Sequence, residues 1–156
     1  MKMINNFLAT LAFAIISVGA YSQVDPVGKD NVAIGWYDVV AYFTDGKALK
    51  GSKEFNHEYN QVVYYFANAA HKSAFVKSPN SYLPQYDGYC AWAVAEKKSK
   101  FPINPETFAI NNGKLYLFFN GPFNGNTFNT LELWKKDETN LLNKAEANWV
   151  ELKAKK

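Results

Sequence analysis

An apolar run over residues 7–18 separates the beginning of this chain from everything that follows it. Lys2 supplies a positive charge before the run, and Ala20-Tyr21-Ser22 places small residues at the −3 and −1 positions of a cleavage site. The run has 12 residues, whereas a helix that spans a bilayer needs roughly 20. Residues 1–22 are therefore predicted to be a secretory signal peptide, with Gln23 as the new N-terminus. We expect the mature protein to be exported, and to be periplasmic or secreted.

Residues 23–156 are predicted to form a single domain. Cleavage leaves about 134 of the 156 residues, which is enough for one hydrophobic core and too few for two ordinary domains. No second apolar run of the sequence is long enough to span a bilayer, so we expect no membrane contact after cleavage. All 17 basic residues are lysines, and arginine is the side chain that pairs best with bases and phosphates. Nucleic acid is therefore not an expected partner.

Short strand patterns occur at four places in the chain. They cover residues 39–43, 52–55, 62–66 and 115–119. The run at 62–66 is β-branched and aromatic throughout, so we expect a central strand there. Asp45-Gly46 and Asn112-Gly113 are typical of hairpin turns, and a turn near Asn60 joins the second and third strands. The Asn- and Gly-rich residues 120–129 are predicted to form a loop.

Helices are predicted in separate parts of the chain from the strands. Asn68 is a candidate N-cap for a helix over residues 69–77. A short apolar helix follows over residues 89–97, and a C-terminal helix with one apolar face begins near Asp137. Asn104-Pro105-Glu106 predicts a further helical turn, because proline suits the first helical position. The expected fold is therefore α+β, with a small antiparallel sheet packed against short helices and a C-terminal amphipathic helix.

Several familiar functional motifs do not occur in the sequence. It contains no phosphate-binding glycine loop, no paired-cysteine zinc motif, no haem attachment motif and no serine nucleophile elbow. Nucleotide and haem are therefore not expected as cofactors. Both methionines lie in the predicted signal peptide, which excludes methionine-rich copper sites from the mature protein. The side chains that remain for chemistry are Cys90, His57, His71 and Asp38.

Cys90 is the single cysteine of the chain, so it cannot form an internal disulfide. If a helix begins at residue 88 or 89, the thiol lies in its first turn, where free N–H groups stabilise a thiolate. We expect this effect to lower the pKa of the Cys90 thiol. Two alternatives remain: burial as a small apolar side chain, and pairing with a cysteine of another molecule.

The two histidines and Asp38 each have a structural and a functional interpretation. His71 lies early in the predicted helix over 69–77, where it is either a solvated helix residue or a metal ligand. His57 has the same two interpretations within a strand. Asp38 is expected to cap a neighbouring backbone rather than to act as a ligand or a general base. Aromatic residues make up 17% of the chain; most must be core, although they could also line a pocket beside Cys90.

Short segments spread over the chain share the pattern of one family. They are Gly35-Trp36-Tyr37-Asp38-Val39-Val40-Ala41-Tyr42-Phe43, Gly51-Ser52-Lys53-Glu54-Phe55, Tyr64-Tyr65-Phe66, Phe75 with Pro79 and Tyr82, Gly88-Tyr89-Cys90-Ala91, Pro105-Glu106, Gly113-Lys114-Leu115-Tyr116-Leu117 and residues 145–149. In combination they resemble the exported YHS-domain-containing (seleno)protein family. The resemblance covers nearly all of residues 23–156, which it implies to be a single YHS-like domain.

The resemblance also implies which residues matter. Some relatives have selenocysteine at the position that matches Cys90, which implies thiol or selenol chemistry there. More distant YHS domains occur in metal-handling proteins such as heavy-metal pumps, and their cysteines match Ala67 and His71 of this chain. Asp87 stands where close relatives usually have glycine.

Three functions remain as hypotheses. The first is a binding protein for a soft transition metal ion such as copper or zinc, held by Cys90 with His71, because one cysteine alone cannot hold a metal. The second is a redox enzyme that uses Cys90 together with an external thiol. In the third, the aromatic residues bind a small ligand or a partner and Cys90 only packs. The first hypothesis leads, so we expect a protein that is not an enzyme, and the sequence leaves the oligomeric state open.

Overall fold

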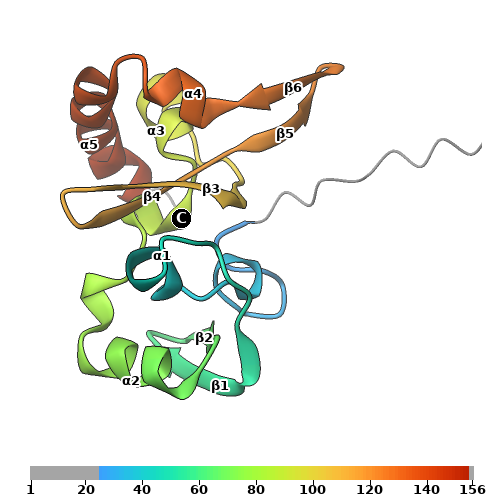
Figure 1. The fold of residues 1–156 in the computed structure, drawn as a ribbon. Coiled ribbons are helices and arrows are strands. Elements are labelled where there is room, and N and C mark those ends of the chain that lie inside the picture. The colour runs from blue at the N-terminus through green and yellow to red at the C-terminus, as the bar shows by residue number, and fades with distance from the viewer. Residues whose placement is uncertain (1–24, 155–156) are drawn as a thin grey trace, which may run out of the picture.

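The structure, a computed structural model, describes residues 25–154 and has an α+β fold (Figure 1). Within that range, three two-stranded antiparallel sheets are combined with five α-helices. The predicted fold class is therefore confirmed. The predicted signal peptide, residues 1–22, lies outside the described residues. No helix within residues 25–154 is long and apolar enough to cross a bilayer.

The bounds of the regular elements are as follows. The helices are α1 (Ala41–Thr44), α2 (Ala69–Lys77), α3 (Ala91–Lys97), α4 (Thr130–Trp134) and α5 (Glu138–Ala154). The strands are β1 (Ser52–Tyr59), β2 (Val62–Phe66), β3 (Asn104–Asn111), β4 (Lys114–Phe118), β5 (Asn120–Phe123) and β6 (Asn126–Asn129). Short 3-10 turns are η1 (Ile34–Trp36), η2 (Pro79–Ser81) and η3 (Gln85–Gly88).

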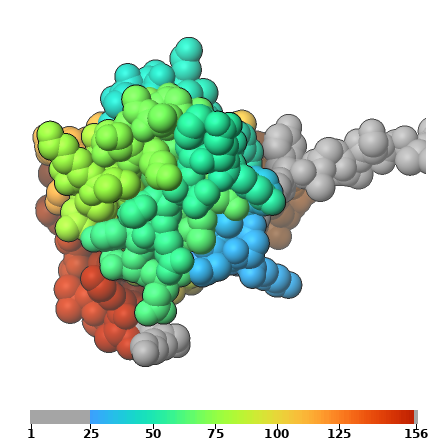
Figure 2. Space-filling model, turned by 90° about the horizontal axis from the view of Figure 1, so that it is seen from below, coloured from blue at the N-terminus to red at the C-terminus, as the bar shows by residue number. Residues whose placement is uncertain are grey.

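Strand β4 lies between the two parts of the hydrophobic core. In Figure 1, β1, β2 and α2 form one end of the molecule, whereas α3, α4 and α5 lie at the other; Figure 2 shows the first of these ends from below. Leu115 and Leu117 pack into the core cluster that contains Cys90, and Tyr116 and Phe118 pack into the cluster that contains α5. Successive side chains of a strand point to opposite faces. Both faces of β4 are therefore covered, which explains its run of buried residues.

The predicted hairpin over the second and third strands is confirmed. Strands β1 and β2 pair antiparallel through Asn60 and Gln61, whose φ angles of 52° and 65° are those of a type I′ turn. The predicted central position of 62–66 is not observed: β2 belongs to a two-stranded sheet, with one further bridge between Val63 and Val32. The Asn112-Gly113 hairpin is also confirmed, between β3 and β4.

Three predicted helices are confirmed. Helix α2 has the predicted bounds, and the Asn68 side chain accepts a hydrogen bond from the His71 N–H at 2.9 Å. Helix α3 begins at Ala91, slightly later than predicted, with Cys90 as its N-cap residue. Helix α5 buries the apolar face that the sequence pattern predicts, with Leu141, Ala145 and Leu152 turned inward.

The strand predicted at residues 39–43 is wrong, because this segment forms α1. The Asp38 carboxylate accepts hydrogen bonds from the backbone N–H groups of Val40 and Ala41, at 2.8 and 3.3 Å. Such side-chain acceptors satisfy the free N–H groups at a helix start and thereby compete with strand pairing. A short apolar run shows no clear hydrophobic periodicity, so the sequence pattern could not distinguish a helix from a strand here.

Two predictions in the second half of the chain are also wrong. The helical turn predicted at residues 104–106 is the irregular beginning of β3, where the register shifts between Asn104 and Phe108. Proline is tolerated at such an irregularity because no ladder hydrogen bond needs its missing N–H. Residues 120–129, predicted to be a loop, form the β5–β6 hairpin around Asn124 and Gly125, with φ angles of 49° and 79°.

Candidate functional site

Cys90 lies where the chain enters α3, inside the core. Its side chain is 0% exposed, although its position at a helix start agrees with the sequence prediction. The sulfur lies between two segments that are distant in sequence, the end of β4 and the beginning of α4. Cys90 is thus a buried thiol with polar neighbours.

Two polar groups contact the Cys90 sulfur. The Phe119 N–H donates to Cys90 Sγ at 3.4 Å, and Thr130 Oγ1 lies 3.3 Å from the same sulfur. Thr130 Oγ1 also lies 3.0 Å from the Phe119 carbonyl oxygen, to which its hydroxyl can donate. A hydroxyl has one hydrogen to give, and either the thiol or the hydroxyl can be the donor in the contact between Cys90 and Thr130. The sulfur thus belongs to a buried network of polar groups.

Burial raises the pKa of the Cys90 thiol above its ordinary value. Removal of the sulfur from water outweighs the opposing effects of the Thr130 hydroxyl and of the nearby N–H groups of Ala93, Phe119 and Trp92. The prediction of a lowered pKa is therefore wrong. Its physical reason is that the sequence shows the helix start but not the complete loss of solvent around the sulfur.

An aromatic pocket lies beside Cys90, since Thr130, which contacts the Cys90 sulfur, also lines this pocket. The cavity has a volume of about 320 Å³ and is almost entirely apolar. It is lined by Trp92, Ala93, Lys97, Phe101, Phe123, Phe128 and Thr130. The walls come from α3, the segment after it and the β5–β6 hairpin, which projects from the body of the protein in Figure 1. An aromatic pocket of this kind is what the third sequence hypothesis requires.

His71 forms a second polar centre, anchored by a buried carboxylate. His71 Nδ1 lies 2.7 Å from Asp38 Oδ2, and the Asp38 side chain is 0% exposed. The same oxygen accepts the Ala67 N–H at 2.8 Å. A carboxylate can only accept, so the proton between the two side chains belongs to Nδ1. The expected capping role of Asp38 is confirmed, and the structure adds an imidazole to its partners.

The other ring nitrogen of His71 faces two oxygen atoms. Nε2 lies 3.3 Å from Asp45 Oδ2 and 3.3 Å from Thr44 Oγ1. The Thr44 hydroxyl donates to the same Asp45 oxygen at 2.6 Å. A carboxylate that fixes Nδ1 while Nε2 faces further ligands is the usual support of a metal-bound histidine.

Cys90 and His71 belong to different sites. Their polar partners do not overlap, and α2 and α3 lie toward opposite ends of the molecule in Figure 1. In the part of the chain that the structure describes, no group of three or more His, Cys, Asp or Glu side chains could hold a metal ion. His57 packs against the Phe75 ring, with centroids 6.2 Å apart. The sequence prediction joined Cys90 with His71, and the structure does not bring the two side chains together.

Two functional residues were missed by sequence reasoning. The sequence prediction places Thr130 in no site, because it expects a loop at residues 120–129. In the structure, β6 ends at Asn129 and positions Thr130 next to Cys90. Asp45 was interpreted as a turn residue beside Gly46, whereas α1 ends there and directs Thr44 and Asp45 toward His71. The Asn124-Gly125 dipeptide, which has the same turn chemistry as Asn112-Gly113, was the available indication of the β5–β6 hairpin.

Comparisons of the chain with protein-family models, with curated proteins and with solved structures found no match. The resemblance to the YHS-domain family thus stays a prediction from the sequence. The aromatic pocket beside Cys90 and the polar centre at His71 are the two candidate sites described so far.

Proposed function

We propose that this chain is an exported, non-enzymatic protein that binds a small aromatic anion in the pocket beside Cys90. The pocket itself carries the proposal. Four of its lining residues are aromatic, and its volume of about 320 Å³ lies at the lower end of the range for small-molecule sites. Phe123 is 45% exposed in the wall, and an aromatic ligand would cover this face.

Lys97 indicates that the expected ligand is an anion. It is the charged residue among those that line the pocket, and its Nζ lies 5.4 Å from the centre of the Trp92 ring. An aromatic acid could therefore stack in the apolar part while its carboxylate faces Lys97. A planar aromatic acid of one or two rings could make both the stacking contact and the ion pair with Lys97.

Cys90 supports this pocket in the proposal but does not react. Its sulfur lies 3.3 Å from the hydroxyl of Thr130, whose side chain forms part of the pocket wall. A redox role needs a thiolate that a substrate can reach, and burial acts against both requirements. The geometry therefore supports ligand binding with a packed cysteine better than the redox hypothesis.

Calorimetric titration with 2-naphthoate tests the proposal. We expect saturable binding that weakens about fivefold in Phe123→Ala, since an aromatic contact contributes about 0.5–1.5 kcal/mol. Ile110→Ala is the matched control, because Ile110 is similarly exposed at 40% but does not line the pocket. Lys97→Gln should weaken 2-naphthoate and leave the neutral 2-naphthalenemethanol unchanged. The absence of binding to the wild type, or equal losses in Phe123→Ala and Ile110→Ala, would overturn the proposal.

A specific observation also favours the metal-binding hypothesis in a relocated form. His71 Nε2 lies 3.3 Å from both Asp45 Oδ2 and Thr44 Oγ1. Two ligands that each lie about 2.0–2.1 Å from a tetrahedral zinc ion are separated by roughly this distance. As a second candidate, we propose a weak Zn(II) or Cu(II) site at His71 and Asp45, supported by Asp38 and completed by water.

A zinc titration separates this site from one at Cys90. Zinc binding should be lost in His71→Gln and should persist in Cys90→Ser. His57→Gln is the matched control, because it removes the other histidine of the chain. If Cys90→Ser loses zinc binding while His71→Gln retains it, the site at His71 and Asp45 is wrong and a metal site at Cys90 is supported instead.

A further inference from the structure

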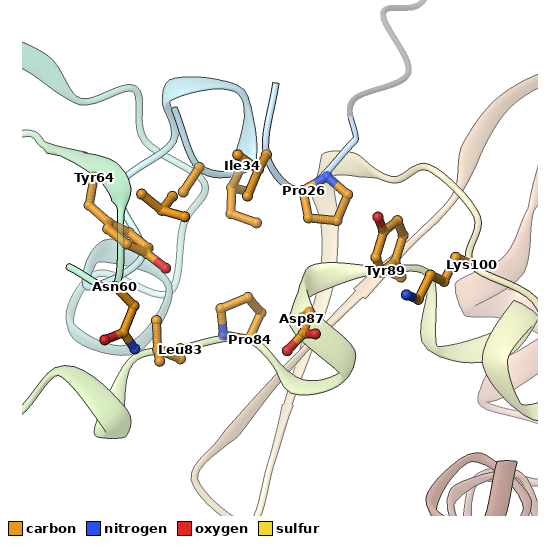
Figure 3. Close-up of a pocket in the computed structure, with 12 residues that line it drawn as sticks. Pro26, Ile34, Asn60, Tyr64, Leu83, Pro84, Asp87, Tyr89 and Lys100 are labelled. Carbon is orange, nitrogen blue, oxygen red and sulfur yellow. The ribbon is translucent and has the colours of Figure 1, made fainter. Parts of the chain in front are cut away.

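A second and larger pocket lies away from both of these centres (Figure 3). Its volume is about 440 Å³. Its wall is partly polar and partly apolar, and Ile34, Val62, Leu83 and Pro84 contribute to the apolar part. Asp87 and Lys100 are the two charged residues of the lining, and Figure 3 shows both on the same side of the pocket, near Tyr89. The pocket thus combines an apolar part with one end that carries both signs of charge.

An unusual turn brings Asp87 to this pocket. Tyr86, Asp87 and Gly88 have φ angles of 56°, 51° and 83°, so three successive residues adopt the left-handed conformation. The turn buries the Tyr86 ring and leaves Asp87 exposed at the pocket. A side chain at position 88 would be strained, because the φ angle is positive and an added Cβ would lie 2.9 Å from Ile34 Cδ1 and 3.0 Å from Pro26 Cβ. Left-handed residues other than glycine are costly and cluster at functional sites.

The polar groups at the pocket suit an ammonium group as well as a carboxylate. The Asp87 carboxylate can accept from an ammonium group, and the exposed Lys100 ammonium can donate to a carboxylate. Burial raises the pKa of the Tyr64 hydroxyl to about 12 and also raises that of Tyr89. Both phenols are therefore neutral at pH 7 and can donate or accept hydrogen bonds.

We propose that this pocket binds a free apolar α-amino acid such as leucine. Its ammonium and carboxylate groups are attached to one carbon atom, which matches two opposite charges at one end of the cavity. Its side chain packs against Ile34, Val62 and Leu83. A peptide terminus carries one of the two charges at its end, so it satisfies Asp87 or Lys100 but not both.

The test is a calorimetric titration of the mature chain with L-leucine, N-acetyl-L-leucine and L-leucine amide. N-acetyl-L-leucine lacks the ammonium group, and L-leucine amide lacks the carboxylate. We expect L-leucine to bind at least tenfold more tightly than either analogue. If all three bind equally, the charged end takes no part and the proposal is wrong. If the amide matches free leucine, the site binds a peptide N-terminus instead.

Variants assign each charge of the ligand to its residue. Asp87→Asn should weaken the binding of L-leucine at least tenfold and leave the binding of N-acetyl-L-leucine unchanged. Lys100→Gln should also weaken the binding of L-leucine at least tenfold, and should leave the binding of L-leucine amide unchanged. Glu54→Gln and Lys47→Gln are matched controls, since they remove exposed charges that do not line the pocket. Asp87→Gly suits the left-handed backbone and stays folded even if another substitution does not. Unchanged leucine binding in Asp87→Gly would overturn the proposal.

The proposal stands apart from the pocket beside Cys90. None of the residues that line one pocket lines the other. Phe123→Ala should therefore leave L-leucine binding unchanged, and saturating 2-naphthoate should not displace leucine. Competition between the two ligands would mean that both occupy one site, which contradicts the assignment of leucine to Asp87.

Discussion

Cys90 Sγ lies 3.3 Å from Thr130 Oγ1, although 40 residues separate the two in the sequence. The contact joins the start of α3 to the start of α4, and through Phe119 it also holds the end of β4. Burial of the sulfur favours the protonated thiol and outweighs the opposite effect of the Thr130 hydroxyl. The contact therefore connects the chemistry of Cys90 to the stability of the fold.

We predict that the thiol of Cys90 is protected at neutral pH. Burial raises its pKa above the ordinary value of 9.0, so the folded protein contains less thiolate at pH 7 than a free cysteine does. Alkylation by iodoacetamide should be much slower than in the urea-unfolded chain. Rapid alkylation of the folded protein at pH 7 would contradict the buried position of the sulfur.

The same shift predicts a loss of stability in alkaline solution. The thiolate is penalised in the folded state, so the contribution of Cys90 to the free energy of unfolding is fully present below the ordinary pKa of 9.0 and decreases as the pH rises above it. Urea unfolding measured between pH 7 and pH 10.5 should show this decrease. Cys90→Ser is the control, because it keeps the contribution of the tyrosines and lacks that of the thiol.

Replacement of Thr130 by valine should destabilise the protein by about 1–3 kcal/mol, the cost of leaving buried polar groups without partners. The hydroxyl donates to the Phe119 carbonyl and accepts from the Phe119 N–H, each at 3.0 Å. Valine keeps the shape and removes these bonds, whereas Thr130→Ser keeps the hydroxyl and should cost less. Urea unfolding curves of the two variants measure the difference, and a smaller loss in Thr130→Val than in Thr130→Ser would show that the methyl group matters more than the hydroxyl.

Replacement of Asp38 by asparagine should destabilise the protein by about 3 kcal/mol, as expected when one partner of a buried pair is removed. The carboxylate accepts from three backbone N–H groups and from His71, and the asparagine amide would turn a donor toward donors. Asp45→Asn is the matched control, since Asp45 also contacts His71 but is 38% exposed. We expect a loss below about 1 kcal/mol there. Similar thermal shifts in both variants would contradict a central role for Asp38.

Local chemistry explains which parts of the fold could be predicted. The bounds of α2 follow from the Asn68 cap, and the Asn112-Gly113 turn follows from residues that accept positive φ angles. The buried face of α5 follows from apolar spacing. In each case the deciding interaction lies within a few residues of the sequence.

The errors concern residues whose partners are distant in sequence. Asp38 caps α1 but also binds Ala67 and His71, and these contacts exist only after β2 and α2 have packed. The pKa of Cys90 depends on burial by β4 and on Thr130, neither of which a helix start reveals. Sequence reasoning therefore found the candidate side chains and their local positions but not which of them share a site.

The last prediction concerns the left-handed turn at Asp87. We expect Asp87→Gly to stabilise the protein by about 0.5–1 kcal/mol. Glycine removes the cost of a left-handed residue, about 1–2 kcal/mol, but it also raises the entropy of the unfolded chain, which cancels part of this gain. The thermal midpoint should rise by about 2–4 °C. Tyr86→Gly is the matched control: Tyr86 has a similar φ angle of 56° but is 4% exposed, and its hydroxyl binds Glu146. Loss of that ring should cost about 3–5 kcal/mol. A lower midpoint for Asp87→Gly would mean that the Asp87 side chain stabilises the turn, and that its strained position needs no ligand to explain it.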